Sequence, residues 1–134
     1  MQRIATPLKG KIMSDKYKLT DETKEASGIK LFRIQALRSF GDVKAGDLGG
    51  WVEGVKNLSQ EGDAWVYGDA WVYGDAWVHG DARVSGNARV YGDAQVFGNA
   101  RVSGNARVYG NAGVLGNARV FDNAPGTPML PEQS

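Results

Sequence analysis

The side chains best suited to chemistry in this sequence are arginines, aromatic residues and a single histidine, which recur at a fixed spacing of six. From residue 62 to 121 the chain reads GDAWVY GDAWVY GDAWVH GDARVS GNARVY GDAQVF GNARVS GNARVY GNAGVL GNARVF. Each hexad consists of Gly, Asp or Asn, Ala, a variable residue, Val and a second variable residue. Guanidinium groups beside aromatic rings suit phosphates, carboxylates or a protein partner. The variable positions therefore carry the candidate chemistry, and the constant positions must hold them in place.

The constant residues of the hexad predict a short strand followed by a corner. Ala and Val lie two residues apart and share one face of an extended chain, so the variable residues point the other way. Gly followed by Asp or Asn tolerates a sharp turn. A helix is excluded because a period of six matches no helical face and each Gly costs about 1 kcal/mol relative to Ala. Three hexads, 18 residues of this sequence, would close one coil, and coils would stack at roughly 4.8 Å.

This pattern resembles the left-handed parallel β-helix of the hexapeptide-repeat superfamily. In that family an aliphatic residue is followed four positions later by a small one, matched here from Val66 and Ala70 to Val120 and Ala124. With the preceding segment LFRIQALRSFGDVKAGDLGGWVEGVKNLSQEGDAWV, the chain is similar to small hexapeptide-repeat proteins of bacteria and prophages, which are often labelled acyltransferases by fold alone. The resemblance implies an all-β, triangular left-handed parallel β-helix.

Stacking hexads three apart sorts the outward residues into columns on three faces. Four of the five repeat arginines follow a corner Asn rather than Asp, so stacked arginines about 5 Å apart lack a local carboxylate. We weigh a face that binds a protein or a small anionic ligand against the alternative that these side chains only cover the sheet. The candidate binding residues are Arg83, Arg101 and Arg119 on the first face and Arg89, Arg107, Tyr73, Tyr91 and Tyr109 on the second.

The tryptophans form a belt around the first full coil. Such a cluster would be a large exposed apolar patch unless something covers it. We expect burial under the N-terminal segment first, a subunit interface of a homo-oligomer (dimer or trimer) second, and a ligand-stacking site third. The candidate interface residues are Trp51, Trp65, Trp71, Trp77 and Tyr67.

His79 is the candidate catalytic residue of an alternative, enzymatic hypothesis. The resemblance implies that acyltransferases of this superfamily use a His general base near a groove between neighbouring β-helices, often with a loop inserted into the coils. This chain has one His and ten unbroken hexads, which favours a surface role for His79. Zinc enzymes on this fold need three His ligands, and no Cys is present, so we expect no metal site. If the chain is an enzyme, it is an O- or N-acetyltransferase with acetyl-CoA as its cofactor; otherwise we expect no cofactor.

The remaining segments predict a capped solenoid. We expect an extended or partly disordered arm in residues 1–15, completed by a β-hairpin to form a cap over 1–45, a solenoid over 46–124 and a disordered tail over 125–134. The hairpin strands are predicted at 16–20 and 29–40 with a turn at 21–28, and Phe32, Ile34, Ala36 and Phe40 on one face. Asn57 and Leu58 are assigned to the Asn and Ala positions of the repeat.

Composition narrows the function classes. The 134 residues carry a net charge of +1, which argues against a duplex-DNA partner. The apolar runs are only a few residues long, far shorter than a membrane span, which argues against a membrane partner. We expect a cytoplasmic location, the host cytoplasm if the chain is phage encoded. Our leading hypothesis is a non-enzymatic binding or scaffold protein of a phage or prophage. It would engage a protein or anionic partner, and either inhibit a host factor or sequester a nucleotide.

Overall fold

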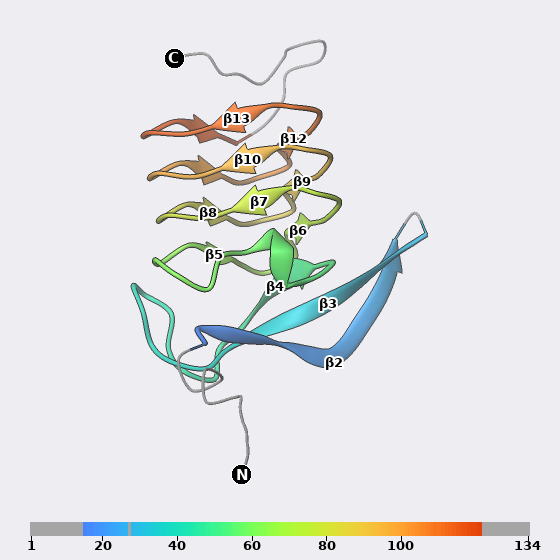
Figure 1. The fold of residues 1–134 in the computed structure, drawn as a ribbon, viewed down its shortest axis with the longest axis vertical. Coiled ribbons are helices and arrows are strands. Elements are labelled where there is room, and N and C mark those ends of the chain that lie inside the picture. Colours follow the sequence, from blue (N-terminus) through green and yellow to red (C-terminus); the bar gives the residue numbers. More distant parts are fainter. Residues whose placement is uncertain (1–14, 27, 122–134) are drawn as a thin grey trace.

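The computed structural model describes residues 15–26 and 28–121, which form an all-β solenoid with one short 3-10 turn (Figure 1). The N-terminal elements are β2 (Tyr17–Ala26), β3 (Ile29–Ala36), β4 (Leu48–Val52) and the 3-10 turn η2 (Val55–Asn57). Ten two-residue strands follow, one in each hexad. They are β5 (Trp65–Val66), β6 (Trp71–Val72), β7 (Trp77–Val78), β8 (Arg83–Val84), β9 (Arg89–Val90), β10 (Gln95–Val96), β11 (Arg101–Val102), β12 (Arg107–Val108), β13 (Gly113–Val114) and β14 (Arg119–Val120).

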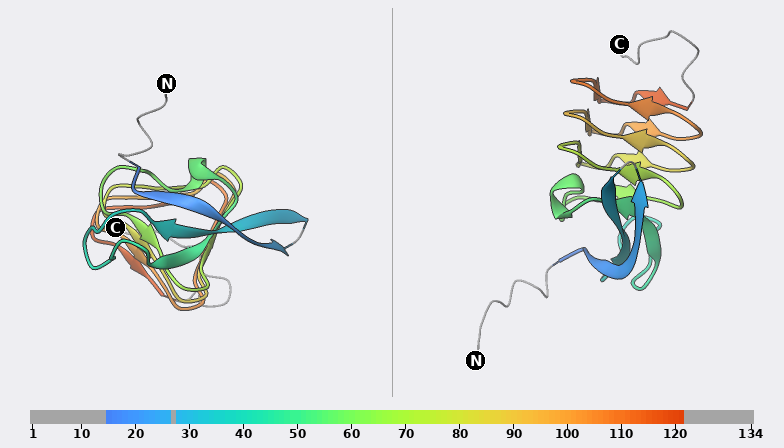
Figure 2. Two further views of the ribbon diagram at one scale, coloured as in Figure 1. Left: turned by 90° about the horizontal axis from the view of Figure 1, so that it is seen from below. Right: turned by 90° about the vertical axis from the view of Figure 1, so that its right-hand side faces the viewer.

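The short strands build three parallel sheets, one on each side of the prism. The first face has the order β14-β11-β8-β5, the third has β13-β10-β7, and the second belongs to the longer sheet β12-β9-β6-β4-β3-β2. Val66 pairs with Val84, so one coil contains 18 residues, and the coils superpose when viewed along the stack (Figure 2). The all-β parallel β-helix with an N-terminal hairpin is therefore confirmed.

The interior is filled by the Ala and Val of each hexad, which are fully buried from Ala64 to Val108. The corner glycines have positive φ, for example 68° at Gly74. A Cβ added there would lie 3.1 Å from the backbone N of Gly92 in the next coil, so both the left-handed conformation and the close stacking require glycine.

The hairpin differs from the sequence-based prediction in its length. Strand β2 continues to Ala26, so the turn predicted at 21–28 is wrong for residues 21–26. The register between β2 and β3 shifts between Leu19 and Thr23, and this irregularity accommodates the polar stretch that we interpreted as a turn. Strand β3 ends at Ala36, before the predicted Phe40. Of the residues predicted to share one face, Ile34, Ala36 and Phe40 are buried, whereas Phe32 is only half-buried.

The predicted arm and tail fall almost entirely outside the described residues. Of the arm only residue 15 is described, and the tail at 125–134 is not described. The boundary between residues 45 and 46 stays a prediction. Strand β4 links the two parts, because it pairs antiparallel with β3 and parallel with β6.

The first coil is two residues longer than the others. Leu58 pairs with Val78, 20 residues away, so Leu58 occupies a Val position of the repeat. Its assignment to an Ala position was wrong because two extra residues lie between Leu58 and Val66, a separation of eight where the hexad gives six. Asn57 accordingly does not occupy a corner of the repeat.

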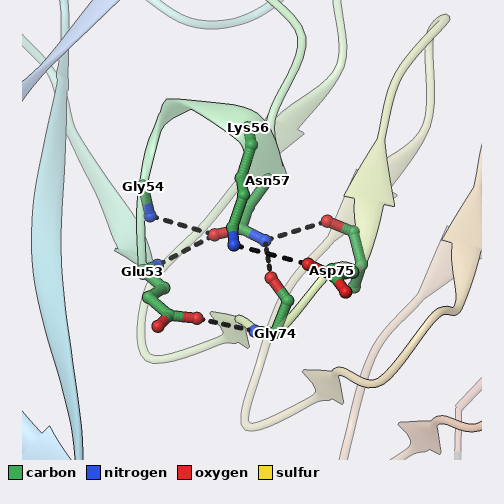
Figure 3. Close-up of polar contacts among 7 residues, drawn as sticks. Glu53, Gly54, Lys56, Asn57, Gly74 and Asp75 are labelled. Carbon is green, nitrogen blue, oxygen red and sulfur yellow. Dashed lines mark hydrogen bonds and ion pairs between the residues drawn. The ribbon is translucent and has the colours of Figure 1, made fainter.

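Asn57 instead joins the 3-10 turn to the first regular coil (Figure 3). Its Oδ1 accepts hydrogen bonds from the backbone N–H of Glu53 (3.1 Å) and Gly54 (3.0 Å). Its Nδ2 donates to the carbonyl oxygens of Gly74 (3.1 Å) and Ala76 (2.9 Å). The side-chain amide therefore supplies the donors that a preceding coil would supply through its backbone.

Lys16 likewise donates hydrogen bonds to backbone carbonyls at another corner of the first regular coil. It is fully buried, and its Nζ donates to the carbonyl oxygens of Ala64 (2.7 Å) and Gly62 (3.3 Å). The third corner is served by backbone, because Trp51 N–H donates to Ala70 O at 3.0 Å. The N-terminal segment thus provides a donor to the Ala carbonyl at each corner of the first regular coil.

We predict that Asn57→Ala destabilises the fold by about 1–3 kcal/mol, because two buried carbonyls and two backbone N–H groups lose their partner. Urea unfolding measures this loss. Asn111→Ala, at an exposed corner, is the control and should change the free energy of unfolding by less than about 0.5 kcal/mol. Equal effects of the two substitutions would contradict the capping role of Asn57.

We further predict that the stabilisation from Lys16 depends on pH. Burial, and secondly Arg38, lower the pKa of Lys16 from 10.5 to about 8, against the raising effect of Asp63 and Asp81. Between these two values the unfolded chain binds more protons than the folded chain, so the contribution of Lys16 to stability rises with pH. The difference in free energy of unfolding between the native sequence and Lys16→Met should grow from pH 7 to 9.5.

Urea unfolding at several pH values provides the measurement. Lys18→Met, two residues along the chain and exposed on β2, reports how the loss of an exposed lysine changes the free energy of unfolding over that pH range. A difference for Lys16→Met that falls as pH rises would show that the buried ammonium is not disfavoured in the folded state.

Candidate functional site

The second face brings together five of the predicted binding residues. Arg89 pairs in register with Trp71 below it and Arg107 above it. Beside this column, the ring of Tyr91 stacks on Tyr73 at 5.0 Å and on Tyr109 at 5.5 Å, with interplanar angles of 4° and 12°. Two arginines therefore lie next to a ladder of three nearly parallel phenol rings.

Cations cover the tryptophans at the lower end of this face. The guanidinium carbon of Arg89 lies 4.1 Å from the ring centroid of Trp71. Lys24 Nζ lies 4.2 Å from the ring centroid of Trp51 and 5.6 Å from that of Trp71. Arg33 also lies over Trp51, at 5.4 Å. The hairpin thus extends the cationic column of the coils downward.

Lys24 and Arg33 were not among the candidates from the sequence. Their positions depend on the pairing of β3 with β4, which sets Arg33 opposite Trp51. The only sequence signal for a cationic surface here is the mildly basic composition of residues 1–60, which hold 11 basic and 7 acidic residues. Arg33 also forms an ion pair with Glu22 at 3.6 Å, which offsets part of its charge.

Tyr73 provides a neutral hydroxyl group on this face. Burial, and secondly the neighbouring Tyr91, raise the pKa of Tyr73 above its usual value of 10. Its phenol therefore remains protonated near neutral pH and can donate a hydrogen bond. Together with the guanidinium groups, the face presents donors and flat π surfaces, a combination that suits anionic and planar groups.

The first face holds the other three candidate arginines. Arg101 pairs in register with Arg83 and Arg119. Arg83 is engaged by the cap, since its Nη1 lies 3.7 Å from Asp42 Oδ2. Tyr67 donates from its hydroxyl to Asp42 Oδ1 at 2.9 Å, and burial together with this bond raises its pKa to about 12. The structure therefore splits the predicted binding set between two faces, and its binding role stays a prediction.

The tryptophans of the belt differ in how far they are buried. Trp65 is 1% exposed and packs edge-on against Tyr17 and Phe40 of the cap, and Trp51 is also buried. Trp71 is half-buried, whereas Trp77 on the third face is 41% exposed. Burial under the cap thus holds for Trp51 and Trp65, and a subunit interface stays a prediction for Trp71 and Trp77.

His79 lies on the third face inside a stack of rings. Its ring centroid is 3.6 Å from that of Trp77 and 4.9 Å from that of Phe97. Its Nε2 is buried and has no hydrogen-bond partner among the described residues. Burial lowers the pKa of His79, against the raising effect of Gln95, so the imidazole is neutral at pH 7.

Within residues 15–26 and 28–121, no group of three or more His, Cys, Asp or Glu side chains is arranged to hold a metal ion. In the same part of the chain, no helix is both long and apolar enough to span a membrane.

Comparisons with known proteins agree with this architecture. Residues 64–80, 82–98, 94–110 and 100–116 match the model of the YdcK β-solenoid repeat. A protein of Escherichia coli (strain K12) named "Uncharacterized acetyltransferase YdcK" is 37% identical over an alignment that covers 39% of this chain. The alignment spans 18% of that relative, so the chain corresponds to a small part of it. The resemblance to a hexapeptide-repeat β-helix is thereby confirmed at the level of the repeat.

Proposed function

From the premise that the chain is a hexapeptide-repeat type of β-solenoid, we propose that it is a non-enzymatic binding protein whose second face engages an anionic partner. The partner is an acidic protein surface or a small anionic ligand such as a nucleotide. In a phage- or prophage-encoded protein, the same face would serve to inhibit a host factor or to sequester a nucleotide.

The arrangement of Arg89 and Arg107 beside the stacked rings of Tyr73, Tyr91 and Tyr109 carries this proposal. Each ring fixes its neighbour, so the ladder loses little conformational entropy on binding. Arg89 is held against Trp71, which positions a cation at the centre of the face. Aromatic and arginine side chains in such fixed positions dominate the energetics of most interfaces.

Charge favours the second face over the first. At the lower ends of both faces an arginine has a carboxylate within ion-pair distance, Glu22 beside Arg33 on the second face and Asp42 beside Arg83 on the first. The hairpin adds a further cation, Lys24, to the second face alone. Both arginines of the second face follow a corner Asn, whereas Arg83 of the first face follows Asp81. The second face therefore offers the more extended row of cations.

A second candidate function is an acetyl-CoA-dependent acetyltransferase with His79 as the base. The printed name of the Escherichia coli relative favours it. The geometry of His79 does not, because a general base must come within about 2.6–3.2 Å of the proton that it removes. In this chain Nε2 is buried within a stack of rings, which leaves an acceptor no access to it.

To test anion binding, the chain is titrated with ATP and with cyclic dinucleotides while tryptophan fluorescence and thermal stability are followed. We expect quenching and a rise in Tm, both lost in Arg89→Glu/Arg107→Glu with at least a tenfold weaker affinity, because two cations become two anions. Arg83→Glu/Arg101→Glu on the first face changes the net charge equally and is the matched control. Equal loss in both double variants would show that the second face has no special role.

An acidic protein partner is the alternative to a nucleotide. If no nucleotide changes Tm, a polyglutamate peptide is the next probe, and the same pair of double variants applies. Absence of a response to both kinds of probe in the native sequence would refute the anion-binding proposal.

To test the enzymatic alternative, acetyl-CoA turnover is measured with the native chain and with His79→Ala. We expect no difference between them, because His79 serves in packing. Turnover that disappears with His79→Ala would instead establish the acetyltransferase function and overturn the proposal above.

A further inference from the structure

The third face, formed by β7, β10 and β13, carries no charged residue at its outward strand positions. Two of these residues are prominently exposed, Trp77 at 41% and Leu115 at 51%. The first and second faces, in contrast, each bear a column of arginines that would repel a second copy. The outward residues of the third face are Trp77, Gln95 and Gly113 in one column and His79, Phe97 and Leu115 in the other.

The first of these columns falls in size from one end to the other. Trp77 lies at its lower end and Gly113 at its upper end. Gly113 is not explained by the chain's own packing. It is absent from the glycines with positive φ, and a Cβ added to it would meet only Leu115 Cδ2, at 3.9 Å. The glycine therefore leaves room for an inserted side chain at a position where the other nine hexads have Trp, Arg or Gln.

Along the edge between the third and first faces, the charge changes from one end of the solenoid to the other. The corner column of this edge runs from Asp63 and Asp81 to Asn99 and Asn117. Between residues 61 and 121, the segment 61–93 contains six acidic residues and two arginines, whereas the segment 94–121 contains three arginines and no acidic residue. The lower coils are thus acidic and the upper coils basic.

From these features we infer that two copies of the chain pair through their third faces, with antiparallel solenoid axes related by a two-fold axis. Trp77 then fills the space at Gly113 of the partner subunit. Gln95 and Phe97 lie at the axis, each opposite its own copy. Asp81 then lies opposite the corner of Asn117 of the partner subunit, which Arg119 follows two residues later. The large Trp77 thus meets the small Gly113, and a carboxylate lies near a guanidinium group. A parallel pair would instead bring the acidic lower coils of both copies together.

Sedimentation velocity of the full chain tests the pairing. The native sequence is expected at about twice the monomer mass of 14.4 kDa. Trp77→Lys is expected to weaken the dimer at least tenfold, whereas Leu37→Lys, at a cap residue that is 40% exposed, leaves it intact. A monomeric native chain at about 100 µM, a mass of three copies, or an unchanged dimer in Trp77→Lys would overturn the inference.

Gly113→Arg gives a test that does not depend on loss of stability. Arginine occupies this position in five hexads and favours a strand more than glycine does, so Tm should stay the same or rise. The dimer should nevertheless weaken at least tenfold, because the space is filled. A Gly113→Arg variant that remains dimeric would exclude insertion of Trp77 at this site.

Charge reversal tests the orientation of the two copies. Arg119→Asp is expected to weaken the dimer severalfold, because it opposes Asp81 of the partner subunit. Combination with Asp81→Arg restores opposite charges across the interface and should restore the dimer. Failure of the double variant to recover would overturn the antiparallel arrangement.

Discussion

The backbone hydrogen-bond ladder between successive coils is the constraint on which the rest of this structure depends. A residue donates its N–H to the carbonyl 17 positions later, as from Trp71 to Ala88 and from Arg89 to Ala106, both at 3.0 Å. This ladder fixes the spacing between coils, so only glycine fits at the stacked corners and only Ala and Val fill the interior. Outward side chains inherit the same spacing. The tyrosine ladder of the second face, with ring separations of 5.0 and 5.5 Å, is a direct consequence of the coil repeat.

A ladder of this kind must begin at an end that has no coil beneath it. At this end, the equivalent Ala carbonyls of the first regular coil accept hydrogen bonds from three different donors. These donors are the ammonium of Lys16, the backbone N–H of Trp51 and the side-chain amide of Asn57. Burial of a lysine is costly, and its two carbonyl partners offset the cost. The same N-terminal segment places Lys24 and Arg33 on the second face. Closure of the solenoid and extension of the cationic surface are therefore achieved by one hairpin.

Features that depend only on the hexad repeat could be predicted from the sequence. Features that depend on contacts between residues far apart in the sequence could not. The coil length, the Ala and Val interior and the arginine and tyrosine columns follow from a strict period. The role of Lys16 does not, because its partners lie 46 and 48 residues away and a lysine near a strand normally faces solvent. The tryptophans show most clearly that long-range packing determines the burial of a repeat residue. Trp65, Trp71 and Trp77 each follow the same three residues, Gly-Asp-Ala, yet they are buried, half-buried and exposed, because the cap covers one face and not another.

Identical repeats alone would give a prism with three equivalent faces, and a specific function requires that this equivalence be broken. In this chain the cap contacts the first face through Asp42, and the hairpin lengthens the sheet of the second. At the lower end of the third face, the turn around Leu58 is what residues 15–26 and 28–121 add to the strands. Pairing of two copies through that face would bury Trp77 and leave both second faces open. A partner with two anionic sites could then bind both faces at once, and the second contact would form at a high effective concentration. The division of the three faces among capping, binding and self-association thus follows from the variable positions and the cap, while the constant positions maintain the frame.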